Sequence, residues 1–518
     1  MPVVSMLAAA AALAQTRPDQ EYRSEELRGK RELTVTGGFE SEYYEFDNLD
    51  FRKLDESSDQ AILDSDDRGA FAFTGANLAI AYQVDPQIRF VFEGSHRGLW
   101  GDDQIGSTNQ YGGFLYIPSL YVDLATAPDN GVNFRVGRQY FTIGGLGGAK
   151  DYALADVLDM VRVDVPLPGA IGHVSLIPIN VFSVSGDISE VNFQAYIGEQ
   201  FPETIGFRGE TLTRRFGAVV LLDELPGPVD AAAYAFDSLV GARGTGSDLS
   251  YDGQLGNFID KDYVVNFGVR ASATFADLVV PFAHFDGSSG IDRKELVVED
   301  VDTNGFAYGG GVRIDGSTML ANGHPGVFGE LSYFDAFGPA YAENGQQYSH
   351  GYVGMKGQQV GGILLSRFMG WHPSAYLGRN GVDDRPHDIE RKSATRVIHA
   401  GAGFELPVGL RASAGWWMLT DSGITYLNFS DLDNITPPYG YSRSEYAAER
   451  RLGQGLANEL DVEVGWEFGE HVNIYGGGAT VLPGPYYRVE IDRVAGTALG
   501  SEDAVSAWTA YGGAQVEF

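Results

Sequence analysis

Short segments in which apolar and polar residues alternate dominate the chain. In one of them Ile88, Phe90 and Phe92 occupy every second position, and charged or polar side chains occupy most of the positions between them. The segment 506–518 repeats the pattern, with apolar or small residues at even positions, hydrogen-bonding groups at most odd positions, and Phe518 at its end. A period of two places successive side chains on opposite faces of a strand. The alternation therefore predicts β-strands that have one face in an apolar medium.

Segments of this kind recur along nearly the whole chain and predict about 20 strands, within a range of about 18 to 22. The candidate strands are 33–46, 70–84, 87–100, 114–126, 132–144, 158–167, 171–184, 214–223, 228–240, 262–274, 276–285, 305–314, 325–336, 349–356, 359–370, 395–405, 409–420, 456–467, 471–482 and 506–518.

The connections between these strands come in two lengths that alternate. Short connections contain Pro and Gly, as in "PDNG" at 128–131 and "PLPG" at 166–169, because these residues preset or relax φ at sharp reversals. Long connections such as 47–69, 101–113 and 421–455 separate them. Outer-membrane barrels have short periplasmic turns at one end and long extracellular loops at the other. The sorting predicts this architecture, with both ends of the chain on the periplasmic side.

The predicted fold class is therefore all-β: a transmembrane, antiparallel, up-and-down outer-membrane β-barrel. In such a barrel the apolar face of each strand points outward to lipid, and the polar face lines the lumen. Aromatic residues recur near the strand ends, as at Trp100, Tyr140 and Trp371, where the girdles of a membrane barrel lie. A lumen enclosed by this many strands is wide enough to hold water.

Composition is consistent with a membrane barrel. Cysteine is absent, so disulfides and thiol chemistry are excluded. The mean hydropathy is −0.13, and no stretch of about 18 apolar residues follows the first residues, which excludes transmembrane helices. The formal charge of −34 argues against nucleic acid, since phosphate binding needs clustered Lys and Arg. The acidic loops are expected either to be solvated or to bind divalent cations beside lipopolysaccharide.

The beginning of the chain predicts export. Residues 1–14 hold a short apolar run that ends in "ALA", as in a secretory signal peptide, although no Lys or Arg precedes the run. Residues 15–31 are polar and aperiodic and predict a periplasmic linker, so that 32–518 form the barrel as one domain. The expected location is the outer membrane of a Gram-negative-type bacterium. The expected partners are outer-membrane lipid and lipopolysaccharide and a hydrophilic solute, with a monomer favoured and an oligomer as the alternative.

Arginine recurs on the polar face of the predicted strands. Guanidinium groups match carboxylates, and rings of cationic side chains favour anions in pores. Each arginine has an alternative role in the barrel wall, as the partner of an inward carboxylate. The arginines that alternation places inward are Arg89, Arg97, Arg135, Arg162, Arg270, Arg313 and Arg411, and the candidate acidic partners include Glu93, Asp123, Asp164, Glu405 and Asp461.

Residues 134–165 resemble the alginate export family of outer-membrane barrels. The pattern is a strand with Gly137-Arg138-Gln139, a loop, and a strand with Asp159-Met160-Val161-Arg162, so the resemblance covers about 30 of the 518 residues. It implies a monomeric barrel, usually of about 18 strands, with an arginine-rich conduit for an anionic polysaccharide. It further implies Arg138 and Arg162 as pore residues and Asp159 as a partner. Alternation alone points Arg138 outward unless a bulge near Gly137 shifts the register.

No pattern in the sequence predicts a cofactor or a catalytic metal site. The nine histidines are scattered without metal-binding spacing. The segments 64–69 and 430–434 resemble calcium-binding loops, but neither completes an EF-hand. An outer-membrane hydrolase would need a carboxylate or His–Ser group at the loop rim, and spacing assembles none.

Two functions remain. The first is a channel for hydrophilic, anionic solutes such as sugar acids, oligosaccharides or an exported polysaccharide. The alternative is a structural or partner-binding barrel whose acidic loops make the contacts.

Overall fold

The structure is a computed structural model. It describes residues 32–48, 68–101, 114–127, 131–143, 150–169, 171–184, 211–222, 225, 227–243, 259–293, 300–302, 304–337, 340–341, 347–349, 351–355, 357–358, 360–368, 375–376, 395–421, 455–469, 471–484 and 505–518. The predicted signal peptide at 1–14 and linker at 15–31 lie outside the described residues. The calcium-like segment 430–434 lies outside them too, as does most of 64–69.

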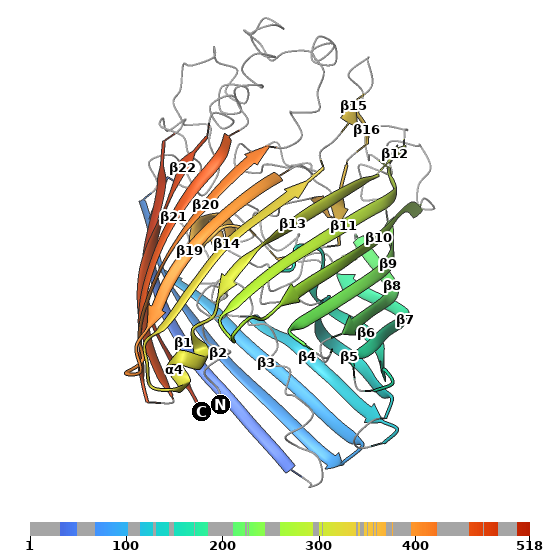
Figure 1. Cartoon of the computed structure of the whole chain (residues 1–518), viewed down its shortest axis with the longest axis horizontal. Coiled ribbons are helices and arrows are strands. Elements are labelled where there is room, and N and C mark those ends of the chain that lie inside the picture. Colours follow the sequence, from blue (N-terminus) through green and yellow to red (C-terminus); the bar gives the residue numbers. More distant parts are fainter. Residues whose placement is uncertain are drawn as a thin grey trace, which may run out of the picture.

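Eighteen antiparallel strands close into a barrel (Figure 1). In ring order they are β1 (Glu32–Asp47), β2 (Arg68–Asp85), β3 (Ile88–Gly101), β4 (Phe114–Ala125), β5 (Asn133–Thr142), β6 (Ala155–Pro166), β7 (His173–Val184), β8 (Thr211–Leu222), β9 (Val229–Arg243), β10 (Ile259–Ala273), β11 (Val279–Arg293), β13 (Gly305–Ile314), β14 (Gly326–Ala336), β19 (Thr395–Glu405), β20 (Leu410–Asp421), β21 (Gly455–Phe468), β22 (Val472–Pro483) and β23 (Ala507–Glu517). Every strand pairs with the next one in this order, so the predicted architecture is confirmed.

The ring closes where β1 pairs with β23. Their register runs from Gly38 opposite Glu517 to Asp47 opposite Trp508. Phe518 extends the seam, because its N–H donates to the carbonyl of Gly37 at 3.0 Å and its carbonyl accepts from the N–H of Gly37 at 2.9 Å. The seam therefore leaves neither strand as an open edge, which is the condition for a sheet to cross a bilayer.

The predicted sorting of connections is also confirmed. Short turns join β2 to β3, β10 to β11 and β19 to β20 at one end of the barrel, and the longer connections leave from the other end (Figure 1). In the turn between β10 and β11, Ala276 and Asp277 both have positive φ, 51° and 50°. The connection from β13 to β14 contains the short helix α4 (Ser317–Ala321).

The barrel has 18 strands, at the lower end of the predicted range of about 18 to 22. Two of the 20 candidate strands, 349–356 and 359–370, are not wall strands, and their described residues 351–355 and 360–368 lie inside the barrel. These described residues hold the two-residue strand β17 (Val353–Gly354), paired with β18 (Ala375–Tyr376), and the π-helix η4 (Ile363–Phe368). Three further short strands, β12 (Asp300–Asp302), β15 (Ala340–Tyr341) and β16 (Gln347–Ser349), extend the sheet at the end of the long connections.

The two faces of the wall differ as the alternation predicts. Phe90, Val265 and Val464 are 46%, 37% and 48% exposed on the outer face, whereas their neighbours Arg89 and Asn266 point inward and are buried. A closed barrel with an exposed apolar outer face is suited to lipid rather than to water. The chain is thus a membrane-spanning barrel of the outer membrane.

Candidate pore and its lining

The strand registers place six of the predicted arginines on the inward face. Arg89 lies opposite Gln83 and Asp123, and Arg135 lies opposite Asp123 and Arg162. Arg270, Arg313 and Arg411 occupy inward positions on β10, β13 and β20. Arg97 has an inward position opposite Gly75, but its side chain lies outside what the structure describes.

Arg135 and Arg162 form the centre of a charged patch near the short turns. Arg135 donates to both oxygens of Asp123, at 2.7 and 3.3 Å, and lies over the ring of Tyr121 with 4.3 Å to its centroid. Arg162 donates to Asp164 at 2.7 Å, and Asp164 also accepts from Ser175 at 2.6 Å. The two guanidinium groups come from directly opposed positions, so the carboxylates offset a repulsion that like charges on facing strands would otherwise produce.

The other inward charges follow the same principle of local pairing. Arg313 lies opposite Glu330, and Arg411 lies opposite Glu405 and within 3.7 Å of Glu467. The carboxylate of Glu93 accepts from Ser119 at 3.0 Å. Asp123 and Asp164 thus pair with Arg135 and Arg162, which fits the alternative role of these arginines in the barrel wall, and their role in a pore stays a prediction.

Arg138 and Asp159 do not line the pore, which corrects the placement that the resemblance implied. Arg138 donates to both oxygens of Asp159, at 2.9 and 2.7 Å. The pair shares the outer face with Val136 and Leu120, which are 44% and 54% exposed. Gly137 has φ of 129°, but the register between β5 and β6 runs on without a shift. Alternation therefore continues through Gly137 and points Arg138 outward.

Arg270 is inward but fully enclosed, so it anchors a segment rather than facing the bore. Its guanidinium lies 2.7 Å from Asp151, on the segment between β5 and β6, and 3.4 Å from Asp286 on β11. Asp286 also accepts from Tyr234 at 2.5 Å and contacts His284 at 2.7 Å. Asp151 caps its own segment, because it accepts from the N–H groups of Ala153 and Leu154 and from Ile143 and Thr142.

A second inward segment, formed by the described residues 351–355, 357–358 and 360–368, crosses from one part of the wall to another. At its beginning, Val353 accepts from Asn266 of β10 at 2.7 Å and donates to Ser288 of β11 at 3.0 Å. Arg215 of β8 donates to the carbonyl of Met355. The two inward segments also bind each other, since Met355 donates to Ala153 at 2.9 Å and Gln358 to Asp151 at 2.7 Å.

The far end of this segment is bound by two carboxylates of β21. Glu459 accepts backbone N–H groups from Gly362 at 2.9 Å and Leu364 at 2.5 Å, and Asp461 accepts from Ile363 at 3.3 Å. Glycine at 362 allows this close approach, because a Cβ there would lie 1.7 Å from a carboxylate oxygen of Asp461. The predicted pore residue Asp461 is therefore an anchor of the inward segment.

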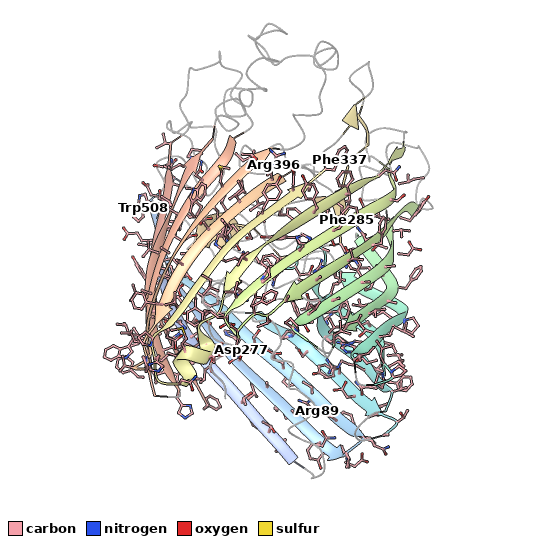
Figure 2. The ribbon with its side chains drawn as sticks, viewed as in Figure 1. Arg89, Asp277, Phe285, Phe337, Arg396 and Trp508 are labelled. Carbon is pink, nitrogen blue, oxygen red and sulfur yellow. The ribbon has the colours of Figure 1, made fainter. Side chains whose placement is uncertain are left out.

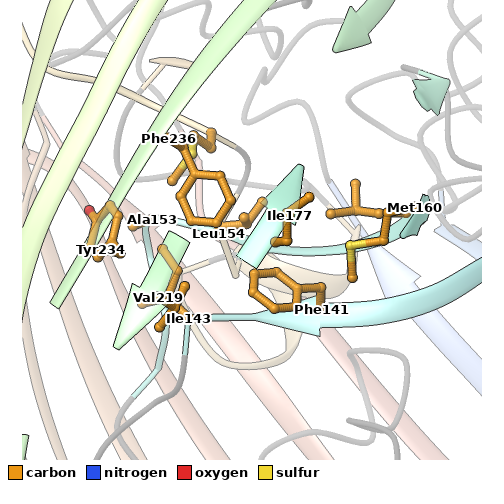
Figure 3. Close-up of a cluster of buried hydrophobic side chains, with 11 residues drawn as sticks. Phe141, Ile143, Ala153, Leu154, Met160, Ile177, Val219, Tyr234 and Phe236 are labelled. Carbon is orange, nitrogen blue, oxygen red and sulfur yellow. The ribbon is translucent and has the colours of Figure 1, made fainter. Parts of the chain in front are cut away.

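An apolar cluster inside the barrel holds both segments to the wall (Figure 3). The inward side chains of β5 to β9 meet the two segments there, and all members are at most 5% exposed. Burial of a large apolar side chain contributes about 1.5–3 kcal/mol, so the inward segments are a fixed part of the barrel interior. The cluster consists of Phe141, Ile143, Ala153, Leu154, Leu158, Met160, Ile177, Val219, Tyr234, Phe236 and Met355.

Lys150, on the first inward segment, contacts both the second inward segment and the wall. Its ammonium donates to the carbonyl of Gly361 at 3.1 Å and lies 4.6 Å from the centroid of the Trp417 ring. Removal from water lowers the pKa of Lys150 from 10.5 to about 8, in spite of the opposing charges of Glu330, Glu459 and Asp461. At neutral pH the side chain is thus a largely enclosed cation in a carboxylate-rich setting.

The sequence patterns did not single out Lys150, Asp151, Glu459 or the 351–368 segment. The available signal was the pair of glycines at 361 and 362 next to an apolar run, which was interpreted as a strand. Gly361 has φ of 96°, a value that L side chains rarely adopt and that is uncommon within a regular strand.

Acidic side chains outnumber basic ones on the inward rows of the described strands. The acidic ones include Glu42, Glu93, Asp123, Asp164, Asp286, Glu330, Glu405, Glu459, Asp461, Glu463 and Glu467, and the basic ones include Arg89, Arg135, Arg162, Arg215, Arg270, Arg313 and Arg411. The basic side chains Arg89, Arg135 and Arg162 gather on the arc from β3 to β6, whereas β21 carries only acids.

No group of three or more His, Asp or Glu among the described residues could hold a metal ion. The helices in the described part of the chain are all too short or too polar to cross a membrane.

Searches by sequence find no matching family model and no matching curated protein. Solved structures with a similar outline include OccK11 (OpdR) of Pseudomonas aeruginosa, with 8% identity, a TM-score of 0.44, and coverage of 95% of this chain and 98% of that chain. The outer membrane protein opdK of the same organism has 9% identity, a TM-score of 0.45, and coverage of 94% and 98%. An anion-selective porin from Comamonas acidovorans has 9% identity, a TM-score of 0.38, and coverage of 94% and 100%. All of these structures are porin-like outer-membrane barrels.

Proposed function

We propose that this protein is a passive channel for hydrophilic solutes across the outer membrane. The observation that carries the proposal is the closed ring of strands, with exposed apolar side chains outside and charged side chains inside. Such a wall lowers the barrier for a hydrated solute because it replaces lipid with water and fixed charges. The proposal involves no covalent chemistry and no cofactor.

We further propose that the preferred solutes are small anions, such as a sugar acid or a short acidic oligosaccharide. Arg89, Arg135 and Arg162 support this, because they form a cationic arc on neighbouring strands close to the short turns. Asp123 and Asp164 offset part of that charge, so we expect a modest preference for anions.

An exported polysaccharide such as alginate is the less supported version of this proposal. The resemblance that suggests it rests on Arg138 and Asp159 as well as Arg162, and the first two lie on the outer face. The inward segments also occupy part of the barrel interior, which is more compatible with a small solute than with a long polymer.

Ion selectivity in planar bilayers tests the proposal. Under a KCl gradient, we expect the wild-type channel to conduct and its reversal potential to indicate an excess of Cl⁻ over K⁺ permeability. Arg135→Ala with Arg162→Ala should shift the reversal potential toward K⁺. Arg138→Ala, an arginine in the same motif on the outer face, is the matched control and should leave it unchanged. Folded protein that gives no conductance would refute the channel, and an unchanged reversal potential in the double variant would refute the anion preference.

The alternative function is a barrel whose acidic surface segments bind a partner or cations. The support for this alternative is the acidic composition of the whole chain, which has 70 acidic and 36 basic residues. Deletion of a long connection should abolish function in that case, and blocking the bore with a bulky luminal substitution should have no effect.

A further inference from the structure

A polar cluster interrupts the apolar outer face near the end of the long connections. We call Tyr308, Tyr333, Asp335 and Arg396 the rim cluster. The residues come from β13, β14 and β19, at outward positions that are neighbours across the sheet. Farther along the same strands the outward positions are apolar, as at Leu331 and Phe404, which are 62% and 44% exposed. The rim cluster therefore lies where the apolar band of the barrel ends.

The guanidinium of Arg396 is held in one orientation by the rest of the cluster. Its Nε and Nη2 donate to one oxygen of Asp335, at 3.1 and 3.0 Å. The hydroxyl of Tyr333 donates to the same oxygen at 2.9 Å, and that of Tyr308 lies at 3.4 Å. The side chain of Asp335 is only 6% exposed, whereas that of Arg396 is 35% exposed. The buried carboxylate of Asp335 thus holds the guanidinium in place, and the partly exposed side chain of Arg396 is accessible to lipid or solvent.

An aromatic ledge adjoins the rim cluster on the outer face. Phe306 stacks on Phe285 at 6.1 Å, on Tyr308 at 6.4 Å and on Phe337 at 4.9 Å between ring centroids. Phe285 and Phe306 are 43% and 40% exposed. Figure 2 labels Arg396, Phe337 and Phe285 on the same part of the wall, toward the end opposite the turn at Asp277. Aromatic side chains in this position lie at the level where lipid chains meet headgroups.

We propose that the rim cluster binds the phosphate of a lipid headgroup in the outer leaflet, with the lipid's acyl chains along the aromatic ledge. A guanidinium has five N–H donors in a planar fork that matches phosphate oxygens, and Asp335 occupies only two of them. Asp335 offsets the charge of Arg396, so the attraction for an anionic headgroup comes from the other N–H donors of the guanidinium, and the ledge supplies the apolar contact that a free anion would not use. The inference is independent of conduction and goes beyond the proposed function.

The pair of Arg138 and Asp159 offers a matched comparison. It is also an arginine–carboxylate pair on the outer face, and its arginine is 35% exposed like Arg396. Its outward neighbours are Leu120 on the facing strand and Val136 and Tyr140 on its own strand, and Arg138 donates to both carboxylate oxygens. It lies in the middle of β5 rather than at a strand end, so headgroup phosphates are not at its level.

Native mass spectrometry of the folded protein in detergent can test the proposal. The probe is diphosphoryl lipid A, with the same lipid lacking its phosphates and inorganic phosphate as comparisons. We expect Arg396→Gln to weaken binding of the diphosphorylated lipid about tenfold, as for the loss of a hydrogen bond to a charged group. Arg396→Lys should retain part of the affinity, and Arg138→Gln should bind as the wild type does.

Several outcomes would overturn the proposal. Equal lipid binding by Arg396→Gln and Arg138→Gln would show that the rim cluster is not the site. Equal binding of the lipid without phosphates would leave the aromatic ledge alone as the determinant. Competition by inorganic phosphate at the same concentration as the lipid would identify a site for free anions. Phe306→Ala keeps the charges and should weaken lipid binding alone, and bilayer conductance should stay unchanged in Arg396→Gln.

Discussion

Arg270 and Asp151 lie 2.7 Å apart, although Arg270 lies on β10 and Asp151 lies between β5 and β6, which are not neighbours of β10 in the ring. The guanidinium comes from the wall at β10, and the carboxylate comes from the segment between β5 and β6, which folds into the barrel to reach it. Both side chains are buried, at 6% and 2% exposure. The pair therefore fixes how the first inward segment divides the lumen.

Removing the carboxylate should release this segment. We expect Asp151→Asn to lower the free energy of unfolding by on the order of 3 kcal/mol, because Arg270 would keep a buried charge with Asp286 as its remaining ion-pair partner. Urea titration of the protein in lipid vesicles measures the change. The same variant should conduct more current than the wild type. Asp159→Asn, which breaks an ion pair on the outer face, should leave conductance unaltered, and a conductance change there would contradict the assignment.

Stability should depend on pH through Lys150. Its pKa is about 8 in the folded protein and 10.5 when solvated, so between these values the unfolded chain binds a proton that the folded chain does not. Stability contributed by this group therefore rises with pH from about 8 to 10.5, by up to about 3 kcal/mol at 1.36 kcal/mol per unit.

Lys150→Met removes this dependence while other titrating groups remain. The difference in unfolding free energy between wild type and variant, measured from pH 7 to 10, should shift in favour of the wild type as pH rises. A difference that stays constant over this range would show that Lys150 titrates as it does in water.

Gly362 is a sensitive position in the second inward segment. In Gly362→Ala the new Cβ would lie 1.7 Å from a carboxylate oxygen of Asp461, so the Asp461 side chain must turn away and release its hydrogen bond to Ile363, or the segment must move away from β21. We expect a larger single-channel conductance from a barrel that still folds. Gly512→Ala is the control, since the nearest atom to its Cβ would be a carbonyl oxygen at 3.8 Å. Equal conductance in both variants would mean that the segment does not limit the bore.

The outward assignment of Val265 predicts the effect of a charge at this position. Val265→Arg should destabilise the folded barrel in lipid vesicles by about 2–4 kcal/mol, since the position lies in the middle of β10 and faces the hydrocarbon. Val265→Leu should be nearly neutral. If the arginine variant were as stable as the leucine variant, the outer face at this position would be in contact with water.

The sequence predicted the wall of the barrel well, because apolar residues at every second position indicate a β-strand with one face toward an apolar medium. Alternation at Tyr263, Val265 and Phe267 identified the face that meets lipid, and the register confirms it. The number of strands falls at the lower end of the predicted range of about 18 to 22, because Val353, Met355 and Leu364 are also apolar in short runs but lie in segments that are not wall strands. Apolar residues predict burial but do not indicate whether the apolar medium is the bilayer or a cluster inside the barrel.

The candidate site was predictable only in part. Parity placed Arg89, Arg135 and Arg162 inward, and it pointed Arg138 outward as the structure does. The anchoring role of Arg270 depends on Asp151, about 120 residues earlier in the chain, and no local pattern connects the two. Long-range ion pairs of this kind follow from how a loop folds back, which alternation along strands does not encode.

The cluster around Phe141 and Met355 is a second apolar environment besides the bilayer, and the barrel wall separates the two. The packing of this cluster depends on the geometry of the segments within the barrel. It does not depend on the thickness or the lipid composition of the membrane. Substitutions there could reshape the passage while the surface that lipids touch stays the same. A barrel built this way can change what it admits without changing how it sits in its membrane.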